Sequence, residues 1–374
     1  MQQELAHALQ RHEAACYVIA GLQRECDALR QGAPAPGEAP AGVPDAVTAA
    51  MAQQEARCRE DRRRRKGQPA PGRSRVTVSH DFAVGSGTAH CVCGTADHVY
   101  VAGTAEAFGV VRYDLGRQCV AAVGRGHTNS VHTLAAAGDA LASAAADGTV
   151  RVWRGAAEQL HCAHTLRFAS GVRAMGRRLI GGQYALCATA GDALALADLD
   201  SGVTLLTTDP TTDGGTFSAV EVHPYGTLAA VGTSGGRLAL HDLRQMAEDT
   251  TVHVAGADVR QIDFSVDCFS VAAALRSGAV LVWDLRQLDK PLHTVPARGE
   301  DGVPAYAAFD TAAGRHLAIA SGRRLELRDM TQFDAVASEL TVEKGLFSGL
   351  AWAPDGRHMV SCSVDGVVQV YQTE

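Results

Sequence analysis

Short apolar runs that end in a polar residue recur along the chain at nearly constant intervals. Within the runs apolar and polar positions alternate, as in TVRVW, RLALH and AVLVW, which is the pattern of β-strands in a sheet. The runs close in seven residue pairs: Tyr113-Asp114, Trp153-Arg154, Ala197-Asp198, His241-Asp242, Trp283-Asp284, Arg328-Asp329 and Tyr371-Gln372. Successive pairs are 40, 44, 44, 42, 45 and 43 residues apart. A fixed period in this range predicts seven repeated β-sheet units.

Two series of turn sequences run in step with this period. One precedes the alternating strands: Asp147-Gly148, Gly191-Asp192, Ser234-Gly235-Gly236, Ser277-Gly278, Ser321-Gly322 and Asp365-Gly366. The other lies one strand earlier, as His223-Pro224-Tyr225-Gly226 and Pro354-Asp355-Gly356. The sequence therefore predicts an all-β, seven-bladed propeller of the WD-repeat type over residues 75–374. A strand at residues 76–79 is expected to complete the last blade and close the ring.

Residues 1–30 have a different periodicity. They contain no proline, and a heptad-like seam runs through Leu5, Leu9, His12, Cys16, Ile19, Gln23 and Cys26. A lone helix of this length is marginally stable in water, so it needs a partner. We expect an oligomerisation helix that forms a coiled coil. The alternative is a helix packed on the propeller.

Residues 31–74 connect these two regions. The stretch 31–44 is dominated by Ala, Gly and Pro, which predicts a linker. A second helix is expected over residues 45–66, followed by glycines and prolines that end it. Nine Arg or Lys residues and two acidic residues give residues 57–75 a charge of +7, so the rest of the chain carries −14 within the net charge of −7.

The basic end of that helix contains Arg62, Arg63, Arg64, Arg65 and Lys66. Three interpretations stay open: a nuclear import signal, a contact with RNA or an acidic protein, and a solvated helix end. No aromatic residue is interleaved with the charges, which disfavours a stacking platform for single-stranded RNA.

The second blade contains His127, Ser143, Asp147 and Trp153. In WD-repeat blades such a set forms one buried hydrogen-bond chain, in which Asp orients His, His bonds Ser and Ser bonds the Trp indole N–H. A hydrolase is disfavoured because no Gly-x-Ser-x-Gly elbow is present. We expect no catalytic residue, no metal and no cofactor; Cys91 and Cys93 are interpreted as buried structural thiols. No run of 18 apolar residues or N-terminal signal core occurs, so no membrane association is expected.

The chain resembles a known family, the pre-mRNA-processing factor nineteen family of spliceosomal WD-repeat scaffolds. The resemblance is strongest in residues 4–22, which read Glu-Leu-Ala-His-Ala-Leu, His-Glu-Ala-Ala-Cys and Val-Ile-Ala-Gly-Leu. The basic run at residues 60–67, the Gly-His-Thr at 126–128 and the Trp-Asp-Leu-Arg at 283–286 stand in the order of the family.

The resemblance implies a nuclear scaffold in mRNA splicing that forms a homotetramer and recruits proteins of the Nineteen Complex on its propeller. It also implies links to DNA repair, to ubiquitinated proteins and to ubiquitin transfer through an N-terminal U-box. These 374 residues start at the coiled coil and show no U-box, so ubiquitin ligase activity of this chain is left open. Direct RNA contact and the identity of the propeller's partners are also left open.

Two other classes of protein combine a helix with a propeller. A signalling subunit like the G-protein β subunit has a helix that runs into the propeller without a long Pro-rich gap, so the linker at 31–44 disfavours it. An autophagy-type coiled coil with a propeller is disfavoured by the motif at 4–22.

Overall fold

The computed structural model describes residues 42–65, 75–85, 87–104, 108–137, 140–155, 159–168, 171–189, 192–208, 215–254, 258–297, 303–343 and 345–373. It divides the chain into two compact units, one ending at Gly42 and the other running from Val43 to Glu374. The expected coiled-coil seam, from Leu5 to Cys26, lies outside the described residues.

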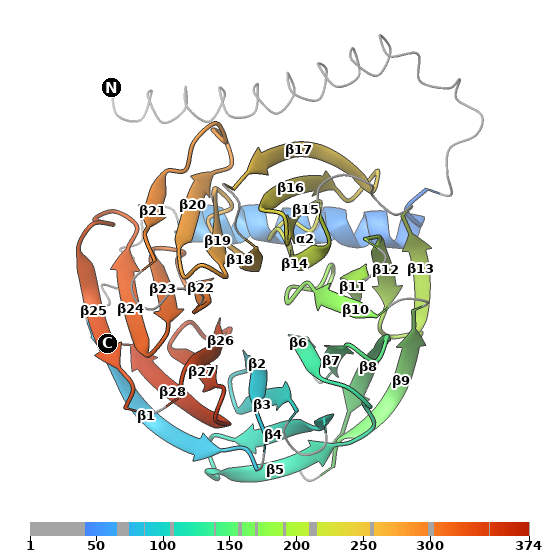
Figure 1. The fold of residues 1–374 in the computed structure, drawn as a ribbon. Helices are drawn as coiled ribbons and strands as arrows, with labels where there is room; N and C mark the ends of the chain where they lie inside the picture. Colours follow the sequence, from blue (N-terminus) through green and yellow to red (C-terminus); the bar gives the residue numbers. More distant parts are fainter. Residues whose placement is uncertain are drawn as a thin grey trace. The chain divides into compact units, whose positions relative to one another are not determined.

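The second unit contains seven antiparallel sheets of four strands each, arranged as a ring (Figure 1). The expected seven-bladed propeller is therefore confirmed. The first three blades are β2 (Ala89–Gly94), β3 (His98–Gly103), β4 (Val110–Asp114), β5 (Cys119–Gly124); β6 (Val131–Ala137), β7 (Ala140–Ala145), β8 (Thr149–Arg154), β9 (His161–Arg167); and β10 (Val172–Met175), β11 (Tyr184–Thr189), β12 (Leu194–Asp198), β13 (Val203–Thr207).

The remaining four blades complete the ring. They are β14 (Phe217–Val222), β15 (Leu228–Thr233), β16 (Arg237–Asp242), β17 (Ala247–His253); β18 (Val259–Phe264), β19 (Ser270–Leu275), β20 (Val280–Asp284), β21 (His293–Val295); β22 (Ala305–Phe309), β23 (His316–Ser321), β24 (Arg324–Asp329), β25 (Val336–Thr341); and β26 (Phe347–Trp352), β27 (His358–Ser363), β28 (Val367–Thr373) with β1 (Val76–Ala83).

The ring is closed by an N-terminal strand, as the sequence predicts. β1 pairs antiparallel with β28, in a register that runs from Val76 opposite Thr373 to Ala83 opposite Val367. β1 thus covers the edge of the last blade, which would otherwise present unpaired backbone groups. In Figure 1 the blue strand β1 lies along the red strand β28.

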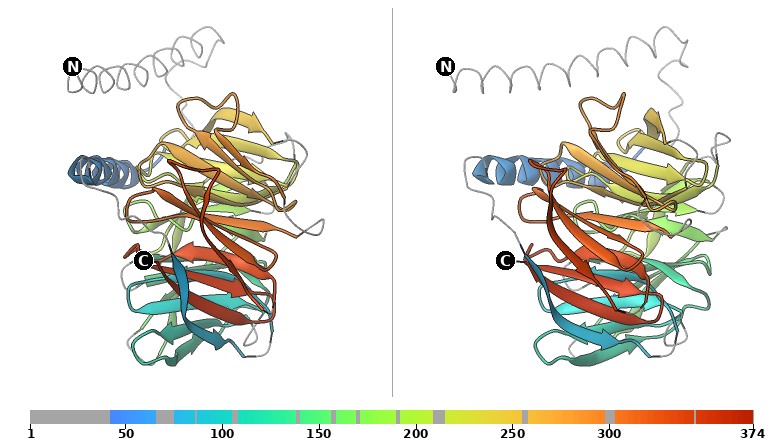
Figure 2. Two further views of the ribbon diagram at one scale, coloured as in Figure 1. Left: turned by 90° about the vertical axis from the view of Figure 1, so that its left-hand side faces the viewer. Right: turned by 60° about the vertical axis from the view of Figure 1, so that its left-hand side comes forward.

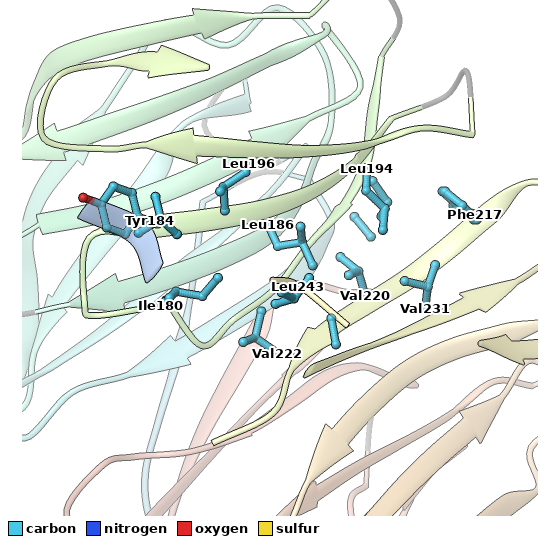
Figure 3. Close-up of a cluster of buried hydrophobic side chains, with 14 of the residues drawn as sticks. Ile180, Tyr184, Leu186, Leu194, Leu196, Phe217, Val220, Val222, Val231 and Leu243 are labelled. Atoms are coloured by element: carbon cyan, nitrogen blue, oxygen red, sulfur yellow. The ribbon is translucent and has the colours of Figure 1, made fainter. Parts of the chain in front are cut away.

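Burial changes from the centre of the ring outward. The innermost strand of the last blade, β26, is buried at every position, whereas the outer strand β25 of the preceding blade alternates between partly buried and exposed residues. Apolar side chains of neighbouring blades pack together between the sheets. Figure 3 shows one such cluster between the third and fourth blades, which includes Leu186, Leu194, Val222 and Leu243.

The helix expected at residues 45–66 is present as α2 (Asp45–Arg65), and it packs on the propeller. Val47 and Met51 are fully buried in the cluster between the third and fourth blades. The division of the structure therefore falls between Gly42 and Val43, whereas the sequence suggested a boundary near residue 75. Figure 2 shows α2 against one face of the ring.

Polar side chains extend the contact between α2 and the propeller along the helix face that carries Val47 and Met51. Gln54 donates from Nε2 to the carbonyl oxygen of Pro224 at 2.9 Å and accepts at Oε1 from the amide of Gly181 at 2.5 Å. Gly181 has a φ of 60°, and a Cβ there would lie 2.8 Å from the Cβ of Ala50. A glycine is therefore required where the turn between β10 and β11 approaches the helix.

The C-terminal part of α2 ends over aromatic side chains. Arg62 donates from Nη1 to the hydroxyl of Tyr225 at 3.2 Å, and its guanidinium lies 4.4 Å from the centre of the Phe269 ring. These residues belong to the turns that join the first two strands of the fourth and fifth blades. α2 thus crosses the same end of three consecutive blades.

We predict that Met51→Asp releases α2 from the propeller, because a charge cannot be buried at this apolar position without a partner. In limited trypsin digestion the bonds after Arg57 and Arg59 should be protected in the wild type and cut at least tenfold faster in the variant. Gln53→Asp places the same charge on the exposed face of α2 and is the matched control. Equal cutting of all three chains would show that the docked helix is not the state in solution.

Candidate functional site

The four residues expected to form a hydrogen-bond chain lie together in the second blade. The indole N–H of Trp153 donates to Ser143 Oγ at 2.8 Å, and Ser143 Oγ lies 2.7 Å from His127 Nε2. His127 Nδ1 lies 2.9 Å from Asp147 Oδ2. A single set of roles satisfies every contact: Trp donates to Ser, Ser to His, and His to the carboxylate of Asp147.

The surroundings hold the hydrogen-bond network of His127, Ser143, Asp147 and Trp153 in one protonation state. Burial lowers the pKa of His127, although the neighbouring Asp147 acts in the opposite direction. Burial raises the pKa of Asp147, but hydrogen bonds from Thr149, Thr128 and His127 outweigh it and lower that pKa to about 2. A neutral histidine and an ionised aspartate match the donor sequence. Ser143 is fully buried and already bonded on both sides, so it is not presented as a nucleophile.

Other blades keep only parts of this arrangement. In the last blade Tyr371 occupies the position of the tryptophan, and its hydroxyl lies 2.9 Å from Ser361 Oγ. In the fifth blade Trp283 is buried, but Ala273 stands where the serine would be. The indole N–H of Trp283 consequently has no hydrogen-bond partner among the described residues.

The basic end of α2 is divided between the propeller and solvent. Arg62 is engaged with Tyr225 and Phe269 as described above, whereas Arg63, Arg64 and Arg65 are exposed. Arg64 pairs with Glu60 at 2.5 Å. Lys66 lies outside the described residues. Three of the five basic residues are therefore accessible to a partner or an import receptor.

Three further findings concern metal binding, the buried cysteine and membrane crossing. Within the described residues no group of three or more His, Cys, Asp or Glu side chains is placed to hold a metal ion. Burial raises the pKa of Cys91 well above its usual range, and the thiol lies 3.6 Å from the carbonyl oxygen of Ala102. In the same part of the chain, no helix combines the length and the apolar character needed to cross a membrane.

A feature that the sequence analysis missed lies at the centre of the ring. The second residue of each innermost strand lines one cavity of about 80 Å³. These residues, one from each blade, are His90, His132, Arg173, Ser218, Arg260, Tyr306 and Ser348. We call this cavity the central cup. Its rim lies at the starts of the innermost strands, at the opposite end of the blades from the turns that α2 contacts.

The floor of the cup is formed by Arg177, which follows β10 and reaches across the ring. Its guanidinium lies 3.2 Å from Glu221 in the fourth blade and donates to the carbonyl oxygens of Ile262 and Leu350, at 3.3 and 3.1 Å, in the fifth and seventh blades. Asp263 lies 3.5 Å from the same guanidinium. Burial lowers the pKa of Arg177, but Asp263 and Glu221 outweigh this effect and raise it. The floor is therefore a buried ionic layer in which one guanidinium is paired with two carboxylates.

The rim carries positive charge. Arg260 and the exposed Arg173 contribute two guanidinium groups, and none of the seven rim residues is acidic. Burial, followed by the charges of Arg260, His90 and Arg173, lowers the pKa of His132 to about 4. Burial and then Arg260 also lower the pKa of His90. Beside the effect of burial, Arg260 lowers the pKa of both histidines, so a positive field acts at the rim.

Comparison with known proteins agrees with the propeller and with the N-terminal motif. A Prp19/Pso4-like family model matches residues 1–33, and a model of the WD domain, G-beta repeat, matches residues 117–154 and 340–372. Pre-mRNA-processing factor 19 homolog 2 of Arabidopsis thaliana is 26% identical over 332 residues, covering 77% of this chain and 63% of its own. Pre-mRNA-processing factor 19 of Bos taurus is 24% identical over 286 residues, covering 65% and 56%.

The chain is similar to pre-mRNA-processing factor 19. The resemblance that residues 4–22 indicated is thereby confirmed. The chain spans less than two thirds of the length of these relatives. Among solved structures, the β-propeller domain of Cps50 (Swd1) from Myceliophteria thermophila superposes with a TM-score of 0.66 at 17% identity, covering 80% of this chain and 100% of that one. This likeness supports the fold alone.

The central cup was missed for a physical reason. Its rim residues are of four types and stand at the period of the blades, so no local motif joins them. The sequence could have indicated the cup if the second residues of the seven predicted innermost strands had been compared with one another. Such a comparison of pre-mRNA-processing factor 19 and its relatives would test whether basic residues gather there.

We predict that Trp153→Phe destabilises the propeller more than Trp283→Phe does. Both substitutions remove the same volume of a buried indole, but only the first removes a donor that has an acceptor. The difference between the two losses should be about 1 kcal/mol, the net value of one buried hydrogen bond. Urea unfolding of both variants measures it. Equal losses would mean that the bond between Trp153 and Ser143 adds nothing to stability.

Proposed function

We propose that this chain acts in the nucleus as a non-catalytic, protein-binding scaffold in pre-mRNA splicing. The observation that carries this proposal is the double match to pre-mRNA-processing factor 19, through the short model at residues 1–33 and through relatives that extend over most of the chain. The scaffold role is supported by the propeller, whose buried hydrogen-bond chain is fully used within one blade.

The proposal assigns a separate task to each part. Residues 1–30 hold copies of the chain together through the seam from Leu5 to Cys26. The propeller binds proteins of the Nineteen Complex, and the exposed Arg63, Arg64 and Arg65 with Lys66 contact an import receptor. Because Arg62 is held against Tyr225 and Phe269, replacing it should disturb the docking of α2 rather than import.

Self-association is expected because one helix alone cannot bury the seam. Light scattering on the intact chain should give the mass of a tetramer. Leu9→Asp combined with Ile19→Asp should give a monomer whose propeller melts at the wild-type temperature. A monomeric wild-type chain at micromolar concentration would remove oligomerisation from the proposal.

Depletion of the protein is expected to cause unspliced transcripts to accumulate. A tagged chain should recover spliceosomal proteins from nuclear extract, and the tagged Leu9→Asp, Ile19→Asp variant should recover fewer of them. If splicing were normal after depletion, and membrane receptors or small GTP-binding proteins were recovered instead, a signalling subunit would become the better assignment.

A further inference from the structure

The central cup offers donors that the protein itself does not use. Arg173 and His132 have no hydrogen bond or ion pair to another described residue, although His132 is mostly enclosed by the rim. The Ser218 hydroxyl lies 2.7 Å from the carbonyl oxygen of Val259, and the Ser348 hydroxyl lies 2.6 Å from that of Ala89. The serines are thus held by the wall, and the cationic groups remain available to a ligand.

Two further rim residues are only partly engaged. Arg260 lies with its guanidinium 5.8 Å from the centre of the Tyr306 ring and its Nε 3.5 Å from the Tyr306 hydroxyl. His90 Nε2 lies 2.9 Å from Thr88 Oγ1. Asp258 is a carboxylate whose charge acts on Arg260, but it does not line the cup and lies 3.9 Å from Arg276.

The shape of the cup limits the ligand to one small group. Arg177 and its partners close the far end, so an entering group stops at the floor. The volume of about 80 Å³ is far below the roughly 300–1,000 Å³ of pockets for drug-sized ligands. A single tetrahedral anion on a flexible stem fits these limits.

The charge distribution favours a peptide over a nucleic acid as the molecule that carries this anion. A single-stranded nucleic acid needs an extended basic groove and several aromatic platforms, whereas the rim has one aromatic residue, Tyr306. Outside residues 57–75 the chain carries a charge of −14, which repels a polyanion. A peptide with one concentrated negative charge can be bound by the two rim guanidinium groups, above the floor where Glu221 is paired with Arg177.

We propose that the central cup binds one phosphorylated serine or threonine side chain of a protein partner. The forked guanidinium groups of Arg173 and Arg260 match phosphate oxygens, and His132 and His90 each supply an N–H donor. A dianionic phosphate also relieves the mutual repulsion of the rim cations. This inference rests on the proposed scaffold function and adds the chemistry by which one partner segment is recognised.

The test uses the intact chain and an array of peptides that carry a central phosphoserine with varied flanking residues. The same array is made with serine and with glutamate at the central position. The best phosphopeptides should bind at least tenfold more tightly than their serine counterparts in fluorescence anisotropy. The cup should saturate with one peptide per propeller.

Three variants locate the binding. Arg173→Gln removes an exposed group without described partners, so it should leave the melting temperature unchanged and weaken binding at least tenfold. Arg260→Gln should weaken binding similarly. Arg357→Gln makes the same charge change at an exposed turn on the opposite end of the last blade, and it should alter affinity less than twofold.

Several results would overturn the proposal. If the serine peptides bound as tightly as the phosphopeptides, the phosphate would not be recognised. If Arg357→Gln weakened binding as much as Arg173→Gln, the peptide would not be bound in the cup. Inorganic phosphate that binds as tightly as the best phosphopeptide would reduce the cup to a free-anion site. A single-stranded RNA oligonucleotide that binds more tightly and loses affinity in Arg173→Gln would assign the cup to RNA. Failure here would leave the splicing defect after depletion intact, so the two proposals can be separated.

Discussion

The antiparallel pairing of β1 with β28 is the constraint on which the rest of the propeller depends. It joins the two ends of the propeller sequence in one sheet and removes the exposed edge of the last blade. Only a closed ring brings the seven innermost strands around a common centre. The central cup exists because of this closure, since each blade contributes one rim residue.

Within the ring, a single side chain connects distant blades. Arg177 starts beside the third blade and contacts the fourth, fifth and seventh. Its fixed positive charge faces two buried carboxylates, Glu221 and Asp263, so removal of Arg177 would leave both carboxylates buried without this cation. The two faces of the ring also differ. One carries α2 over three blades, and the other presents the cup, so partner binding at the cup does not require α2 to move.

The sequence predicted the blades because their third strands combine alternation, turn signals and a fixed period. It also predicted the hydrogen bonds that connect Trp153, Ser143, His127 and Asp147, since Trp, Ser, His and Asp all occur at the spacing of one blade. The docking of α2 was not predicted. Val47, Met51, Gln54, Cys58 and Arg62 lie on one helix face, but two of the five are apolar aliphatic residues and the seam is completed by contacts to backbone and aromatic rings. The rim of the cup could not be recognised before the ring brought together residues that are about a blade apart.

The two proposals together place the binding of pre-mRNA-processing proteins on the face of the propeller that carries the cup. Site-specific photo-crosslinking in nuclear extract tests it most directly, with benzoylphenylalanine replacing Asn129, which is exposed in the loop before β6, or Arg357, which is exposed in the turn after β26. Binding at this face predicts covalent adducts with pre-mRNA-processing proteins from position 129 and only background from position 357. Adducts with such proteins from position 357 and none from position 129 would contradict it.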